Sequence, residues 1–99
     1  MNEQRMIKKA LMQGKVQISG HTFSRIEKRG YTRSDMINCI MQGEMTRTTM
    51  YNKRIAFEIE GFDTDGLPMV LIIGRGKKPA KYRIVTAMPP IHRRFKRII

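Results

Sequence analysis

Hydrophobic residues recur every three to four positions in the first part of the chain, and this spacing is lost further on. The spacing covers residues 2–13, 21–29 and 33–42, and a glycine follows each segment. Because residues three and four apart share one face of an α-helix, the pattern predicts three helices. Residues 32–35 (TRSD) resemble a capping box at the start of the third helix. Its apolar stripe is expected to consist of Met36, Ile37, Ile40 and Met41.

After Gly43, polar and apolar positions alternate instead, which is typical of β-strands. Over residues 54–60, the apolar face is expected to carry Ile55, Phe57 and Ile59, and the opposite face Glu58 and Glu60. Residues 69–73 are apolar at every position, as in a central strand covered on both faces. Residues 46–51 and 82–88 are the other expected strands.

Turn-forming residues separate these strands. Asn52 and Lys53 fit a tight hairpin turn, and residues 61–66 combine glycine with aspartate. Residues 16–18 add a short extended stretch between the first two helices. We therefore expect one α+β domain over residues 1–99, with N-terminal helices packed on an antiparallel meander of about four strands, and a basic C-terminal segment at residues 89–99.

The charge balance of the chain favours a polyanionic partner. There are 20 lysines and arginines against eight acidic residues, and every acidic residue lies at or before position 65. RNA or DNA is favoured over an anionic membrane surface, because the basic segments lack the bulky apolar face of a membrane-binding helix. The expected nucleic-acid ligands all lie in the C-terminal third: Arg75, Lys77, Lys78, Lys81, His92, Arg93, Arg94, Lys96 and Arg97.

The few cysteines and histidines limit the chemistry further. The single cysteine, Cys39, excludes an intrachain disulfide, and no apolar run approaches the ~20 residues of a membrane span. We therefore expect a cytoplasmic protein with no membrane association, and Cys39 in the core beside Ile40. His21, His92 and Cys39 show no paired-ligand spacing, so neither a metal ion nor another cofactor is expected.

The helix expected at residues 21–29 carries a basic stripe. At about 100° per residue, one polar sector contains His21, Arg25, Lys28 and Arg29. Phe23 and Ile26 point to the opposite side, toward the core. Three interpretations remain open for this stripe: a solvated basic face, a helix-turn-helix in which residues 33–42 read DNA, or a site of metal-independent RNA cleavage.

The third interpretation makes specific chemical demands. In RNA cleavage without metal, a 2′-hydroxyl attacks its own phosphodiester, so the site needs a proton acceptor, a proton donor and cations beside the phosphate. Histidine suits the proton transfers because its reference pKa is about 6.5, and the arginine fork bonds two phosphate oxygens at once. His21, Arg25 and Arg29 supply both residue types, and His92 is a candidate second proton-transfer group.

Several stretches, in this order, carry a resemblance to a known family. They are His21 with Arg25 and residues 29–35, the helix end at 40–44, Tyr51, and the strand sequences 66–72 and 84–89. Over about His21 to Pro90, the chain resembles the small bacterial proteins of the domain of unknown function 4258 family, grouped with RelE-like and BrnT-like toxins.

The resemblance implies N-terminal helices on a curved antiparallel sheet, as in toxin ribonucleases that cleave messenger RNA without metal, and a small antitoxin as protein partner. It implies that His21, Arg25, Arg29 and Tyr51 belong to the site. We assign His21 as general acid or base, Arg25 and Arg29 as phosphate ligands, Tyr51 as a substrate-orienting group, and Arg83 to transition-state charge. The alternatives are a non-catalytic nucleic-acid-binding or ribosome-binding module, and a phage or plasmid effector that binds a host RNA–protein complex.

Overall fold

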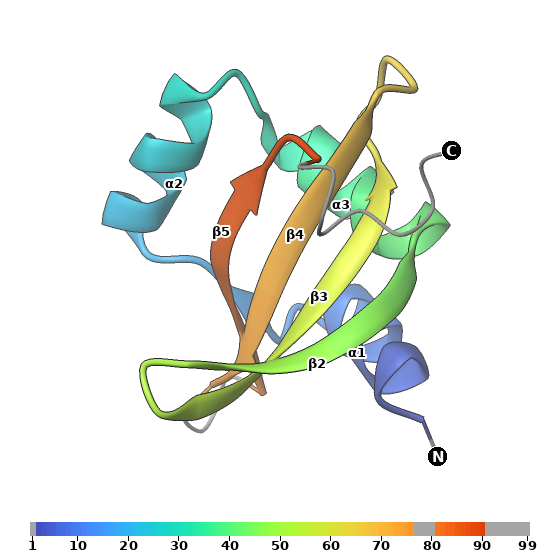
Figure 1. Ribbon diagram of the computed structural model, residues 1–99, viewed down its shortest axis with the longest axis vertical. Coiled ribbons are helices and arrows are strands. Elements are labelled where there is room, and N and C mark those ends of the chain that lie inside the picture. Colours follow the sequence, from blue (N-terminus) through green and yellow to red (C-terminus); the bar gives the residue numbers. More distant parts are fainter. Residues whose placement is uncertain (1, 77–80, 91–99) are drawn as a thin grey trace.

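The computed structural model describes residues 2–76 and 81–90, which form three helices and five strands (Figure 1). In chain order the elements are α1 (Glu3–Met12), β1 (Val16–Gln17), α2 (Gly20–Lys28), α3 (Arg33–Gln42), β2 (Glu44–Tyr51), β3 (Arg54–Phe62), β4 (Pro68–Arg75) and β5 (Tyr82–Met88). The predicted α+β class is confirmed, and the three helices precede all strands but β1, which lies between α1 and α2.

The sheet differs from the prediction in one strand. Its order is β1-β5-β4-β3-β2, and β1 pairs parallel with β5 whereas the other neighbours are antiparallel. The meander of about four antiparallel strands is therefore extended to a mixed sheet of five. The two residues of β1 are too few to show alternation, and the pairing depends on β5, far away in the sequence. The strand predicted to be central, β4, lies in the middle of the sheet.

Local signals set the helix starts. Asn2 and Ser19 cap α1 and α2, and Thr32 with Asp35 forms the predicted capping box of α3. The Asp35 carboxylate also accepts hydrogen bonds from the backbone N–H and the hydroxyl of Thr64, at 2.9 and 2.8 Å. These bonds, led by the one from the Thr64 backbone, keep the pKa of Asp35 below its usual range.

The predicted apolar stripe of α3 is only half right. Met36 and Ile40 are buried, but Ile37 and Met41 are exposed, and Cys39 occupies the core between them. Cys39 faces the sheet and lies against Gly61 of β3, so α3 packs on β3 and β4 along the side that carries Met36, Cys39 and Ile40. The predicted core position of Cys39 is confirmed.

Helices α1 and α3 lie behind the sheet, and α2 stands beside β5 (Figure 1). The core between these layers includes Ile7, Ile40, Phe57, Leu71 and Ile73. Within residues 2–76 and 81–90, no helix has the length and apolar character needed to cross a membrane.

The β2–β3 hairpin turns at the predicted pair. Asn52 and Lys53 both adopt positive φ angles, 50° and 65°, as a two-residue hairpin turn requires. Tyr51 and Arg54 then stand opposite each other across the hairpin. The turn therefore places an aromatic ring and a guanidinium side by side at this end of the sheet.

Tyr82 predicts a measurable pH dependence of stability. Its burial, with the hydrogen bond that its hydroxyl donates to the Glu3 carboxylate, raises its pKa to about 12. The unfolded chain has a tyrosine pKa of about 10, so this contribution is complete below about pH 10 and is lost as the pH rises toward 12. Because the chain contains no tryptophan, tyrosinate absorbance reports the ionisation.

Burial also raises the pKa of Tyr31, so a variant is needed to assign the late titration. In Tyr82→Phe, the absorbance step near pH 12 is expected to disappear. The part of the stability loss that Tyr82 causes between about pH 10 and 12 should disappear with it. A wild-type titration that is complete by about pH 11 would contradict the assignment.

Candidate functional site

One face of the sheet is covered by no helix of the part that the structure describes, and we call it the open face. Side chains alternate along a strand, so cross-strand partners share a face. Glu58 on β3 pairs with Ile72 on β4, which pairs with Thr86 on β5. These three side chains therefore lie on the open face, and Phe57 and Ile73 belong to the face that packs on the helices.

A cavity of about 390 Å³ lies on the open face between α2 and the end of β2, and we call it the α2 cavity. Two arginines, an aromatic ring, a carboxylate and mainly apolar side chains line it: Arg25, Arg29, Thr49, Met50, Tyr51, Glu58, Ile72, Val85, Thr86 and Met88. Three residues predicted to act on RNA therefore meet at one cavity, although Arg25 and Arg29 belong to α2 and its C-cap, and Tyr51 ends β2.

The two arginines of the α2 cavity differ in their bonding. Arg29 Nη1 donates to Thr86 Oγ1 at 3.1 Å and to the Ala87 carbonyl at 2.8 Å, which ties the end of α2 to β5. Arg25 is exposed and has no hydrogen bond or ion pair with the residues described. Arg29 therefore supports the site as well as lining it, whereas Arg25 has all its donors available for a ligand.

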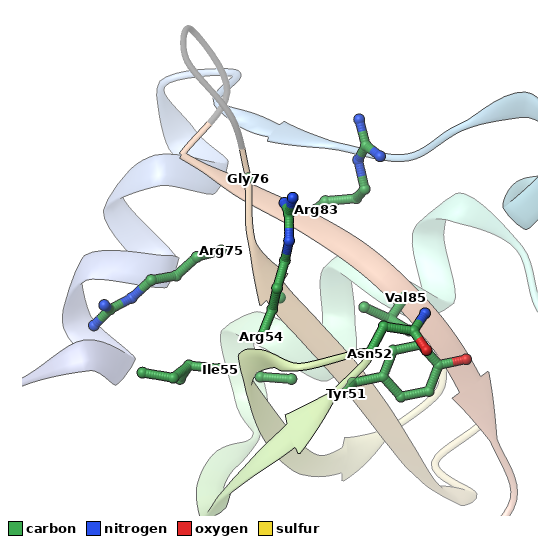
Figure 2. A pocket seen from close by; sticks show the side chains of 10 residues that line it. Tyr51, Asn52, Arg54, Ile55, Arg75, Gly76, Arg83 and Val85 are labelled. Atoms are coloured by element: carbon green, nitrogen blue, oxygen red, sulfur yellow. The ribbon is translucent and has the colours of Figure 1, made fainter.

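A second cavity of about 300 Å³, the hairpin cavity, adjoins the first and shares Tyr51 and Val85 with it. Figure 2 shows Arg54 rising from the hairpin between Arg75 and Arg83, with the Tyr51 ring beside Val85. We call the two neighbouring cavities together the arginine groove. Five arginines line it: Arg25, Arg29, Arg54, Arg75 and Arg83.

The arginines of the groove differ in where their charge lies. Arg75 lines the hairpin cavity, but its guanidinium is directed to the helix-covered side, where it forms an ion pair with Glu3 of α1 at 3.2 Å and lies 5.7 Å from the centroid of the Phe57 ring. Arg54 and Arg83 are exposed and form no ion pair with a carboxylate in the described parts of the chain. Guanidinium groups spaced along a depression are suited to successive phosphates of a nucleic-acid strand.

His21 lies outside this groove. It is exposed on α2 one turn before Arg25, so the predicted stripe is present on the helix surface, and Ile26 is buried on the opposite side as expected. Neither cavity of the groove is lined by His21. The structure therefore brings Arg25, Arg29, Tyr51 and Arg83 to the groove, and places His21 about 6 Å further along the helix axis from Arg25.

The packing of α3 bears on the helix-turn-helix interpretation. Met36, Cys39 and Ile40 are buried against the sheet, and α3 packs on β3 and β4. A recognition helix must present its side chains to the major groove of DNA. The outward side of α3 carries the exposed Arg33, Ser34 and Gln42, so α3 keeps a free face and its packing is compatible with this interpretation.

Most of the predicted nucleic-acid ligands lie outside the described residues. These are Lys77, Lys78, His92, Arg93, Arg94, Lys96 and Arg97. Arg75 lines the hairpin cavity, whereas Lys81 lines a separate cavity beside α1 with Lys9 and Lys15. Of the two described members of this group, Arg75 is therefore at the groove and Lys81 is not.

Sequence reasoning missed two residues of the groove. Arg54 follows the hairpin turn, and its role depends on the turn bringing it opposite Tyr51. Glu58 was expected on the face away from the core, which is correct, but it is only 3% exposed. The alternating pattern gave the face of Glu58, and nothing in the local sequence indicated that this face is hollowed and that the carboxylate is buried there.

The architecture and the groove define an α+β domain with an arginine-lined depression on the open face of its sheet. Comparisons with family models, with curated proteins and with solved structures found no match for this chain. The family resemblance seen in the sequence therefore stays a prediction. Function must be argued from the groove itself.

Proposed function

We propose that this protein is a toxin-like, metal-independent endoribonuclease that binds RNA along the arginine groove. The observation that carries the proposal is the convergence of Arg25, Arg29 and Tyr51 at the α2 cavity, which shares Tyr51 and Val85 with a second cavity lined by Arg54 and Arg83. A groove with several guanidinium groups binds a phosphate backbone, and the aromatic ring between the cavities offers a stacking surface for a base.

The groups around the α2 cavity suit in-line attack by a 2′-hydroxyl. Arg25 and the unbonded donors of Arg29 would stabilise the charge that develops on the phosphate. The Tyr51 hydroxyl would orient the strand where the two cavities meet. His21, about 6 Å along α2 from Arg25, would act at the same phosphate as general acid or base, with water carrying the other proton. The 2′-oxygen then bonds to phosphorus, the bond to the 5′-oxygen breaks, and the 5′-oxygen leaves protonated. The resemblance adds a small antitoxin as the expected protein partner.

The direct test is cleavage of a labelled RNA of mixed sequence in the presence of EDTA. Wild-type protein is expected to cut it and leave 2′,3′-cyclic phosphate ends. His21→Ala is expected to cut about 100-fold more slowly at unchanged RNA affinity, because general acid–base groups contribute about that factor. Ser24→Ala, an exposed neighbour on α2, is the matched control and should cut as wild type does.

Three other results of the cleavage assay would change the proposal. Equal cleavage rates of wild type and His21→Ala would show that His21 takes no part in the reaction, while the protein would still be a ribonuclease. If wild type binds RNA without cutting it, and a ribosome-containing extract gives the same result, the protein is a non-catalytic RNA-binding module and the enzyme proposal fails. Cutting that stops on addition of EDTA would refute the metal-independent mechanism.

A further inference from the structure

Glu58 presents an unusual group in the α2 cavity. It is 3% exposed, and its Oε1 atom is buried with no hydrogen-bond partner in the described parts of the chain. The same residue lines the α2 cavity. A buried carboxylate oxygen without a donor is unfavourable, and native proteins rarely keep one unless a ligand or water supplies the donor.

The charged neighbours of Glu58 do not satisfy this atom. Arg47 is its cross-strand partner on β2, and Arg25 and Arg29 line the same cavity, yet none of these three forms an ion pair with Glu58. The next carboxylate on the strand behaves differently, because Glu60 Oε2 accepts a hydrogen bond from the Thr46 hydroxyl at 2.6 Å. The missing donor is therefore a feature of Glu58 and not of every carboxylate on β3.

The walls around Glu58 suit a flat aromatic ligand. Ile72, Val85 and Met88 give the cavity apolar sides, and Tyr51 adds an aromatic ring. Its volume of about 390 Å³ is within the range of small-molecule sites, which are mainly apolar with a few placed polar groups. The arginines of the same cavity supply contacts for an attached phosphate.

We propose that the α2 cavity is a nucleobase subsite that selects guanine, with the Glu58 carboxylate accepting hydrogen bonds from the Watson–Crick edge of the base. This inference rests on the proposed RNA-binding function and adds its base specificity. Single-stranded RNA exposes this edge, and proteins read it by hydrogen bonds combined with stacking.

Guanine is the base whose edge matches a carboxylate. An ionised carboxylate only accepts hydrogen bonds, and guanine presents two neighbouring donors, N1–H and the N2 amino group. Adenine and cytosine place a ring-nitrogen acceptor beside their amino group, and this acceptor would face a carboxylate oxygen. Uracil has its single N–H between two carbonyl acceptors. The other three bases therefore leave a lone pair opposed to another lone pair.

The test uses the four nucleoside 2′-monophosphates, which bind without being cleaved and so separate base recognition from catalysis. Calorimetric titration of wild-type protein is expected to show guanosine 2′-monophosphate bound about tenfold more tightly than the other three, because a bidentate base contact gives discrimination of this order. Glu58→Gln replaces one acceptor with a donor, which matches the donor and acceptor edges of adenine and cytosine. Its tenfold preference for guanosine monophosphate is therefore expected to be lost, with adenosine and cytidine monophosphates gaining affinity relative to it.

Glu60→Gln is the matched control, because it removes a buried carboxylate from the same face of the same strand without touching the cavity. It should keep the guanosine preference. Equal binding of all four nucleotides by wild type would overturn the proposal, as would a Glu58→Gln variant that weakens all four equally. A Glu58→Gln variant that loses RNA cleavage but keeps the guanosine preference would also overturn it, and would make Glu58 a proton-transfer group. If wild-type protein does not cleave RNA, only the proposed ribonuclease function fails, because nucleotide binding can be measured without any reaction.

Discussion

Replacing Arg25 by alanine is expected to slow RNA cleavage about 1000-fold, since removing one donor to developing transition-state charge costs up to about that factor. Arg25 lines the α2 cavity and makes no hydrogen bond or ion pair with the described residues. Its fork is therefore free to bond two phosphate oxygens, and its loss leaves the folded structure intact. Single-turnover cleavage and urea denaturation of the same preparation measure the two effects separately.

Two further variants show whether position or charge matters. Arg25→Lys keeps the charge but loses the planar fork, so its cleavage rate is expected to lie between those of wild type and Arg25→Ala. Lys28→Ala removes a positive charge from the same helix, and Lys28 is exposed and lines neither cavity of the groove. If Lys28→Ala slows cleavage as much as Arg25→Ala does, the effect is one of net charge, and the assignment of Arg25 to the site is wrong.

Arg29 gives a less direct test of the same site. Its Nη1 holds β5 through Thr86 and the Ala87 carbonyl, so alanine at this position removes two hydrogen bonds of the fold together with a candidate phosphate ligand. A loss of cleavage in this variant would then have two causes that cannot be separated: a shift of α2 and the absence of a phosphate-binding cation. The structural tie also explains why Arg25 and Arg29, four residues apart in a stripe, have different roles in the groove.

Much of the fold could be predicted because its signals are local. The Thr32 and Asp35 capping box, the turn at Asn52 and Lys53, and the apolar stretch of β4 each depend on neighbouring residues. The convergence of Arg25 and Tyr51 was expected only through the family resemblance, because their spacing gives no distance between α2 and β2. Packing of α2 against β5 and the hairpin turn bring them to one cavity.

What could not be predicted depends on pairing between distant segments. β1 has two residues, and its strand character comes from β5, which begins at Tyr82. The alternating pattern of β3 placed Glu58 away from the core, and such a position is normally solvated. Its burial follows from the residues of α2, β2 and β5 around the cavity, a set that no window of the sequence contains. The helical spacing places His21 on the same stripe as Arg25, but the sequence does not show where the groove ends, and His21 lies outside it.

Gly61 is a position where the fold has little tolerance for a side chain. It lies on β3 against α3, and a Cβ atom there would lie 2.7 Å from the Cys39 carbonyl oxygen and 2.9 Å from Cys39 Sγ. Real Cβ contacts are essentially never this short, and a backbone oxygen within α3 cannot move without moving the helix. This contact fixes α3 against the sheet directly behind the open face.

Gly61→Ala is therefore expected to lower the free energy of unfolding by about 3 kcal/mol, the upper part of the usual range for overpacking, and the melting temperature by roughly 12 to 24 °C. Thermal and urea denaturation followed by far-UV circular dichroism measure both. Gly20→Ala is the matched control: it lies at the start of α2 with no atom within 4 Å of the new Cβ, so it should be neutral or slightly stabilising. Adding Cys39→Ala to Gly61→Ala removes the Sγ contact but leaves the closer carbonyl oxygen. The double variant should therefore remain destabilised, and recovery of wild-type stability would show that the side chain, not the helix backbone, sets the limit.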